Sequence, residues 1–236
     1  MAKKQQSNVD PWLKGEIPRT RKALESASKY FDSNDTLTVN TLEAVYGQES
    51  SFGTRMRERG SSSAAGHFHL EPATARQYGL SVTRTNDQRF NIDYASSAAA
   101  RYLKDLNSKF SKKTTLLGRT TTIAVKNPLE RKNLVLAAFN GGEGRVADAQ
   151  RRAEMAGKDP QLWDEVKKFL KSANTKESKA NEMKQYVEKV LFYEDEFALK
   201  SPTDKNLKHK EVRKGKYRCT EGHWVTIDGR PVFICD

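Results

Sequence analysis

Glu49 is the residue whose type and position in this sequence most directly suggest chemistry. In the stretch TLEAVYGQES, residues 41–50, Leu42, Val45 and Tyr46 recur at helical spacing, and Glu49 lies on the same apolar stripe. A carboxyl group there should be partly buried, which costs free energy unless the group is paired or keeps its proton. The stretch therefore indicates either a structural ion pair or a carboxylic acid held protonated for catalysis.

The elements that must position this acid are mostly helices. The helix that carries Glu49 is predicted over residues 36–52, and a later helix should be opened by Asp93, with Tyr94 on its apolar stripe. At NPLE, Asn127 can cap a helix and Pro128 suits its first turn. The remaining helical patterns cover residues 18–31, 71–79, 145–157, 159–171 and 178–197.

Two segments have β character. Residues 113–126, rich in Thr, Ile, Leu and Val around Gly118, predict two short strands. Near the C-terminus, HWVTI and RPVFI flank Asp228-Gly229, which predicts a β-hairpin with a type I′ turn. Cys219 and Cys235 flank this hairpin and leave three alternatives: a disulfide, a zinc site with His223, or free thiols.

The predicted fold class is mainly α, a helical domain with a small β insertion and a C-terminal β-hairpin appendage. We expect a polar N-terminal extension with a mobile start over residues 1–35, a catalytic domain over 36–199, and a basic linker with the hairpin over 200–236. The 236 residues suffice for one sizeable core.

The charge of the chain bears on its partners. A formal net charge of +12 favours association with polyanions such as anionic cell-wall polymer. Nucleic acid is disfavoured, because the basic residues are not interleaved with aromatics in a groove pattern. No run is apolar enough to span a membrane, and MAKKQQSNVDPW is not a complete secretory signal. The chain stays inside its host, leaves by another route, or starts after a removed signal.

Four blocks in order carry a resemblance to a known family. They read ES at Glu49-Ser50, AAGHFHLEPATA from Ala64, AAFNGGEGRV from Ala137 and EMKQYVEKVL from Glu182. This succession resembles the soluble lytic transglycosylases, which share a goose-type lysozyme-like helical fold. The short segment HWVTIDGRPVFI also resembles a motif of phage morphogenesis and prophage proteins.

The resemblance implies cleavage of the β-1,4 bond between N-acetylmuramic acid and N-acetylglucosamine in peptidoglycan. In that family one glutamic acid protonates the glycosidic oxygen and then takes the proton of the muramoyl 6-hydroxyl, which closes onto C1 as a 1,6-anhydro ring. One carboxyl suffices, whereas ordinary glycosidases use two. The resemblance implies a peptidoglycan substrate, no cofactor, a monomer, and action in the periplasm or cell envelope.

By position in the blocks, Glu49 is the expected acid and Tyr186 its orienting hydroxyl. The saccharide groove is expected to involve Phe68 and His69, and Asn140 and Gly141 should approach the sugar. The loop after Glu49 is about two residues longer than in the family, so the active-site serine is Ser61, Ser62 or Ser63. The chain departs from the family where His69 replaces a glutamine, Phe139 a tyrosine and Gly141 an alanine.

Other interpretations compete with this one. Glu49 alone would be a salt-bridged structural acid, and Tyr186 alone a core residue. His67 and His69, spaced His-x-His, could ligate a metal, but no third ligand lies nearby in the sequence and we expect none. At the level of the protein, the alternatives are a goose-type lysozyme-like hydrolase and an inactive, phage-derived or glycan-binding module.

Overall fold

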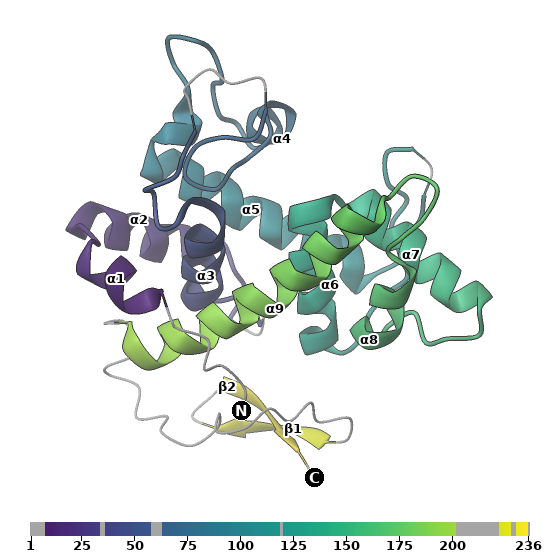
Figure 1. Ribbon diagram of the computed structural model, residues 1–236. Helices are drawn as coiled ribbons and strands as arrows, with labels where there is room; N and C mark the ends of the chain where they lie inside the picture. The colour runs from purple at the N-terminus through teal and green to yellow at the C-terminus, as the bar shows by residue number, and fades with distance from the viewer. Residues whose placement is uncertain are drawn as a thin grey trace, which may run out of the picture.

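The computed structural model describes residues 8–33, 36–57, 63–118 and 120–201, together with the strands 222–227 and 230–235. The described chain is mainly helical (Figure 1). The α-helices are α1 (Val9–Lys14), α2 (Pro18–Ser28), α3 (Val39–Ser50), α4 (Pro72–Gln77), α5 (Ile92–Ser111), α6 (Pro128–Gly141), α7 (Glu143–Met155), α8 (Trp163–Val166) and α9 (Glu177–Lys200), with short 3-10 helices at Gln88–Phe90 and Lys167–Phe169.

The longest helix, α9, organises the molecule. It crosses the middle of the view, with α1 and α3 packed against it toward its C-terminal end and α6 toward its N-terminal end (Figure 1). It packs against α3, α6 and α1, and its own buried face includes Met183, Val187 and Val190. Helices from the N-terminal part of the chain (α1 and α3) and α6 from its middle therefore both pack against α9. No described helix has the length and apolar character needed to cross a membrane.

The N-terminal residues from position 8 onward pack onto the rest of the domain. Val9 and Leu24 are fully buried, and α2 lies against α5. The Ser96 hydroxyl of α5 donates to the carbonyl of Ala23 in α2 at 3.3 Å. The expected domain boundary at residue 35 therefore does not separate two packed units, because residues on both sides of it share one core.

The helix starts follow the capping signals with one correction. Asn127 accepts from the backbone N–H groups of Leu129 and Glu130, so the predicted start of α6 is confirmed. The helix expected to open at Asp93 instead begins at Ile92, because the side chain of Asn91 accepts from the Asp93 N–H. Tyr94, predicted on the apolar stripe of this helix, is 51% exposed.

Residues 113–126 differ from the two strands predicted there. Within the described part of this segment, a single antiparallel bridge joins Thr115 to Thr121. The Thr122 hydroxyl accepts from the Thr114 N–H at 2.9 Å and donates to the Lys109 carbonyl at 2.8 Å. Backbone hydrogen bonds from Leu116 to Thr120 and from Thr122 to Thr114 flank the bridge, while the Thr122 hydroxyl takes the Thr114 N–H that a longer ladder would have used.

A two-stranded antiparallel sheet lies in the C-terminal region. Strand β1 (Gly222–Ile227) pairs with β2 (Arg230–Cys235), with His223 opposite Ile234 and Val225 opposite Val232. The turn predicted at Asp228-Gly229, and Cys219, lie outside the described residues.

Candidate active site

A hollow on the surface brings together Glu49, His69, Asn140 and Tyr186, four of the residues singled out in the sequence. It has a volume of about 190 Å³. Its walls come from α3, from the loop over residues 63–71, from α6 and from α9. The lining residues are Gln48, Glu49, His69, Asn140, Glu182, Gln185, Tyr186 and Lys189.

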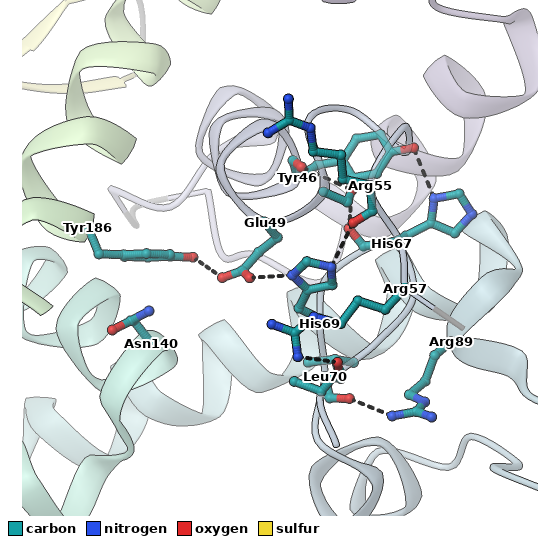
Figure 2. A network of polar contacts seen from close by, with 12 residues as sticks. Tyr46, Glu49, Arg55, Arg57, His67, His69, Leu70, Arg89, Asn140 and Tyr186 are labelled. Atoms are coloured by element: carbon teal, nitrogen blue, oxygen red, sulfur yellow. Dashed lines mark hydrogen bonds and ion pairs between the residues drawn. The ribbon is translucent and has the colours of Figure 1, made fainter. Parts of the chain in front are cut away.

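The Glu49 carboxyl group lies between two polar partners. The Tyr186 hydroxyl donates to Glu49 Oε1 at 2.7 Å, and His69 Nδ1 lies 3.5 Å from Glu49 Oε2 (Figure 2). The Glu49 side chain is 13% exposed, so the predicted partial burial of this acid is confirmed. Burial, together with the neighbouring Glu49 carboxyl, raises the pKa of Tyr186 well above its ordinary value. The tyrosine therefore keeps its proton and acts as a donor to Glu49.

The residue after Glu49 shapes the turn that ends α3. The buried Ser50 hydroxyl donates to the carbonyl of His67 at 2.7 Å and accepts from the Gly53 N–H at 3.0 Å. Ser51, Phe52 and Gly53 all have positive φ, of 49°, 58° and 87°. Ser50 thus joins this left-handed turn to the loop over residues 63–71. This structural role explains why a serine follows Glu49.

The loop that carries His69 is anchored by a buried ion pair that the sequence reasoning missed. Arg89 is 1% exposed, and it donates to both carboxylate oxygens of Asp87 at 2.9 and 2.7 Å. Its Nη1 also donates to the carbonyls of Ser63 and Leu70 at 2.8 and 3.0 Å. The DQR spacing of Asp87 and Arg89 permits such a pair, but nothing in it indicates burial.

A second polar cluster lies on the other wall of the hollow. The Asn140 side chain donates to Glu182 Oε1 at 3.0 Å, and Lys179 Nζ lies 2.9 Å from the same oxygen. Although partial burial opposes it, the hydrogen bonds from Lys179 and Asn140 hold the pKa of Glu182 below its ordinary value. Lys179 also donates to the Asn140 carbonyl. Glu182 and Lys179 were not predicted as site residues, and they fix the orientation of the Asn140 amide.

Some predicted site residues lie elsewhere. Phe68 is 1% exposed and stacks on Tyr46 in the core, so its side chain does not line the hollow. Gly141 is buried against α9, and a Cβ there would overlap the Met183 side chain. Ser63 is exposed in the loop before Ala64, whereas Ser61 and Ser62 lie outside the described residues.

His67 and His69 point to different partners. His67 Nδ1 lies 2.9 Å from the Tyr46 hydroxyl, while His69 faces Glu49 (Figure 2). Burial lowers the pKa of His67 to about 4, so this imidazole is neutral at physiological pH. The two histidines therefore have separate roles and do not converge on one point.

The other acids near the motif blocks are engaged or exposed. Glu143 Oε1 pairs with Lys109 Nζ at 2.9 Å. Glu71 is exposed at the residue that precedes α4. A second hollow, of about 390 Å³, is lined by Asp148, Arg152, Ser172, Ala173 and Asn174. Its half-exposed Asp148 and Arg152 pair at 3.7 Å, so the arrangement contains no buried acid or base.

The arrangement at Glu49 can transfer a proton. The Glu49 carboxyl group is mostly buried, one of its oxygens accepts from a tyrosine that stays protonated, and the other oxygen faces an imidazole. General acid–base catalysis needs such a group within reach of the reacting bond. The mainly helical fold and this site define a candidate acid–base enzyme whose acid lies in a surface hollow.

The family follows from comparison with known proteins. The model of the family described as Transglycosylase SLT domain matches residues 26–162, which is more than half of the chain. The chain therefore belongs to the SLT transglycosylase family. The expected membership, based on the four sequence blocks, is confirmed.

Curated relatives carry related names. A "membrane-bound lytic murein transglycosylase F" of Desulfosudis oleivorans is 26% identical over 76% of this chain and 36% of its own length. A "membrane-bound lytic murein transglycosylase D" of Escherichia coli is 29% identical over 57% of this chain and 23% of its own length. A third, named F, from Shewanella frigidimarina is 30% identical over 62% of this chain. The matches span about a third or less of the lengths of the first two relatives.

Proposed function

We propose that this protein is a peptidoglycan lytic transglycosylase. It cleaves the β-1,4 bond between N-acetylmuramic acid and N-acetylglucosamine and leaves a 1,6-anhydromuramoyl end. The single observation that carries the proposal is the Glu49 carboxyl, 13% exposed and held by the Tyr186 hydroxyl at 2.7 Å, in the hollow where all four motif blocks meet. Membership of the SLT family and the names of the curated relatives support the same reaction.

In this proposal Glu49 acts twice. It first donates its proton to the glycosidic oxygen as the bond from C1 to that oxygen breaks. The carboxylate then accepts the proton of the muramoyl 6-hydroxyl, whose oxygen bonds to C1 and closes the anhydro ring. Tyr186 holds Oε1 throughout, so the oxygen that delivers the proton is Oε2. Asn140, oriented by Glu182 and Lys179, offers an amide to the sugar.

A hydrolase is the second candidate, and one observation favours it. Glu182 lines the same hollow as Glu49, and its lowered pKa keeps it ionised. Ordinary glycosidases use a second carboxylate to activate water or to attack C1. Glu182 is already engaged by Lys179 and Asn140, which supports a positioning role and leaves the transglycosylase as the better interpretation.

We place the site of action at the periplasm or cell envelope, where peptidoglycan lies. The relatives' names describe membrane-bound proteins. The net charge of +12 supports adhesion of this chain to anionic wall polymer, in addition to binding of the glycan strand.

The first prediction concerns Glu49→Gln. Glutamine preserves the shape of the side chain but has no acidic proton, so release of muropeptides from purified peptidoglycan should fall by at least about 1,000-fold. Mass spectrometry of the wild-type products should find 1,6-anhydromuramoyl ends, one water lighter than reducing ends. Glu71→Gln, the same change at an exposed acid, is the matched control and should keep wild-type activity.

The other outcomes decide between the alternatives. Reducing ends from the wild type would establish the hydrolase and direct attention to Glu182. A folded Glu49→Gln protein that stays active would contradict the role of Glu49. Binding to peptidoglycan without any released product would indicate a glycan-binding module.

A further inference from the structure

The imidazole of His69 has a defined tautomer. His69 Nε2 lies 2.8 Å from the backbone carbonyl of Arg55, and a carbonyl oxygen can only accept a hydrogen bond (Figure 2). Nε2 therefore carries a hydrogen. In the neutral imidazole the other nitrogen, Nδ1, then has a free lone pair, and it is Nδ1 that lies 3.5 Å from Glu49 Oε2.

The backbone holds both ends of this contact in place. The Arg55 N–H donates to the Ser50 carbonyl at 2.8 Å, and the Gly66 N–H donates to the Met56 carbonyl at 2.7 Å. His69 itself has a φ of 42°, a left-handed conformation that is rare for a residue with a side chain. Such strain persists only where surrounding contacts determine the conformation, and here it turns the imidazole toward Glu49.

We propose that His69 is a positioning residue that shares one proton with Glu49, through the tautomer fixed by the Arg55 carbonyl. This inference rests on the proposed function, and it goes beyond groove lining. With the proton on Oε2, the protonated oxygen of Glu49 faces Nδ1 at 3.5 Å while Oε1 accepts from Tyr186. With the proton on Nδ1, the same two side chains form an ion pair.

The number of protons on the Glu49–His69 pair is the same before and after the reaction. Glu49 transfers it to the glycosidic oxygen as the bond to C1 breaks. The carboxylate left behind faces Nδ1 and the Tyr186 hydroxyl, both at the distances of the unbound site. The proton of the 6-hydroxyl then returns to the pair as the new bond to C1 forms, so the pair ends with the proton that it began with.

The consequence is a broader pH range of activity. An isolated carboxyl group loses its proton near about pH 4.3 and an isolated imidazole near about pH 6.5, whereas a coupled pair titrates as a unit. Activity should therefore persist to higher pH than it would with a carboxyl group alone at this place. Among the described residues, the charged groups that line the hollow with the pair are Glu182 and Lys189, both on α9, and Glu182 is engaged by Lys179. The uncharged side chains of the lining are Gln48, Asn140, Gln185 and Tyr186.

The kinetic test is the pH profile of kcat for wild type and His69→Gln. Glutamine is the residue that the family usually has at this position, so the variant should fold and stay active. The alkaline limb should move to lower pH by about one unit. His67→Gln is the matched control, because the His67 imidazole faces Tyr46, and its alkaline limb should match that of the wild type. Superimposable profiles for His69→Gln and wild type would overturn the proposal.

A second measurement does not depend on activity. Imidazole ¹⁵N NMR on the full chain should find His69 with its hydrogen on Nε2, and its titration midpoint should fall by about half a unit or more in Glu49→Gln. A midpoint that does not change, or a hydrogen on Nδ1 of the neutral ring, would overturn the pairing. If no peptidoglycan product appears at all, the proposed function fails, while this titration still decides whether His69 and Glu49 share a proton.

Discussion

Tyr186 of α9 contacts the Glu49 carboxyl group directly. Its ring is 4% exposed, and its hydroxyl donates to Glu49 Oε1 at 2.7 Å. A hydrogen bond to a group that changes charge contributes about 1.5–3 kcal/mol. This contact therefore has enough energy to hold the orientation of the acid.

The prediction at this scale is Tyr186→Phe. Loss of the hydroxyl leaves Oε1 without its donor, so kcat should fall by about 10- to 100-fold, while KM changes little because the ring remains. Steady-state release of soluble muropeptides measures both parameters. Tyr193→Phe is the matched control on the same helix, since the Tyr193 hydroxyl accepts from Asn8 Nδ2 at 3.3 Å, away from Glu49. Equal losses in the two variants would mean that the effect is general to α9.

The sequence predicts individual site residues unevenly. Glu49 can be predicted as a site residue because acids are rare on the apolar stripe of a helix. The family pattern adds Tyr186, His69 and Asn140. The burial of Arg89 with Asp87 is not readable, since it depends on two carbonyls that a distant loop brings to the guanidinium. The tautomer of His69 likewise depends on one backbone carbonyl and cannot follow from residue types.

At the scale of elements, the site depends on how α3, α6 and α9 fit together. Glu194 Oε1 of α9 pairs with Lys132 Nζ of α6 at 2.6 Å and accepts from Thr41 Oγ1 of α3 at 2.6 Å, all in the buried core. Close to the hollow, Gly141 of α6 faces Met183 of α9. Because Asn140 and Tyr186 are the neighbours of these contacts on the two helices, spacing between α6 and α9 should set the geometry of the site.

Gly141→Ala tests that spacing. The new methyl group would overlap the fully buried Met183 side chain, and overpacking of this kind costs about 1–3 kcal/mol. The free energy of unfolding in urea should fall by that amount, and activity should fall with it. Gly144→Ala is the control, because a Cβ there meets nothing within 4 Å and alanine favours the helix. A combination of Gly141→Ala with Met183→Ala should cost less than the sum of the two changes. Strict additivity would show that the two residues do not press on each other.

Whether an element can be predicted from the sequence depends on whether its determinants are local in the chain. Helix starts with a side-chain cap, such as Asn127 before Pro128, are local and were predicted. Of the two short strands expected over residues 113–126, the described part of the segment has one antiparallel bridge, because the Thr122 hydroxyl takes the Thr114 N–H and β propensity does not reveal such a bond. The packed state of α2 was also missed: its buried residues are Thr20, Ala23, Leu24 and Ala27, a weakly apolar face whose partner α5 lies far along the chain.

At the scale of the whole molecule, one buried charge cluster joins distant parts of the chain. Arg21 of α2 pairs with Glu43 of α3 at 2.5 Å and with Glu16 at 2.8 Å. The hydroxyl of Ser201, directly after α9, donates to Glu43 Oε1 at 3.1 Å. Glu43 is 0% exposed, and burial raises its pKa to about 7, although Arg21 opposes the shift. Two carboxyl groups thus share one guanidinium at the junction of α2, α3 and the end of α9.

The raised pKa of Glu43 predicts a pH-dependent stability. Between its ordinary value of 4.5 and about 7, the folded chain binds more proton at Glu43 than the unfolded chain does. Stability from this group therefore decreases as pH rises through that window, by up to about 3 kcal/mol. The shift of His67, to about 4, acts in the opposite direction, because a neutral buried imidazole is favoured as pH rises. The overall profile of the wild type therefore mixes the two effects, and only a difference between variants isolates Glu43.

Glu43→Gln supplies that difference. Glutamine fills the same space and is never ionised, so it avoids the cost that Glu43 meets on ionisation and leaves Arg21 with Glu16 as its acidic partner. The free energy of unfolding of the variant, relative to the wild type, should rise steadily between pH 5 and pH 8 and level off above that range. Urea denaturation at each pH measures it, and Glu71→Gln at the surface should give a flat difference. A difference for Glu43→Gln that falls with pH would mean that the ion pair with Arg21 outweighs burial and that the carboxyl stays ionised in the folded protein. In that case α2, α3 and the end of α9 are joined by charge, and acid rather than base should separate them.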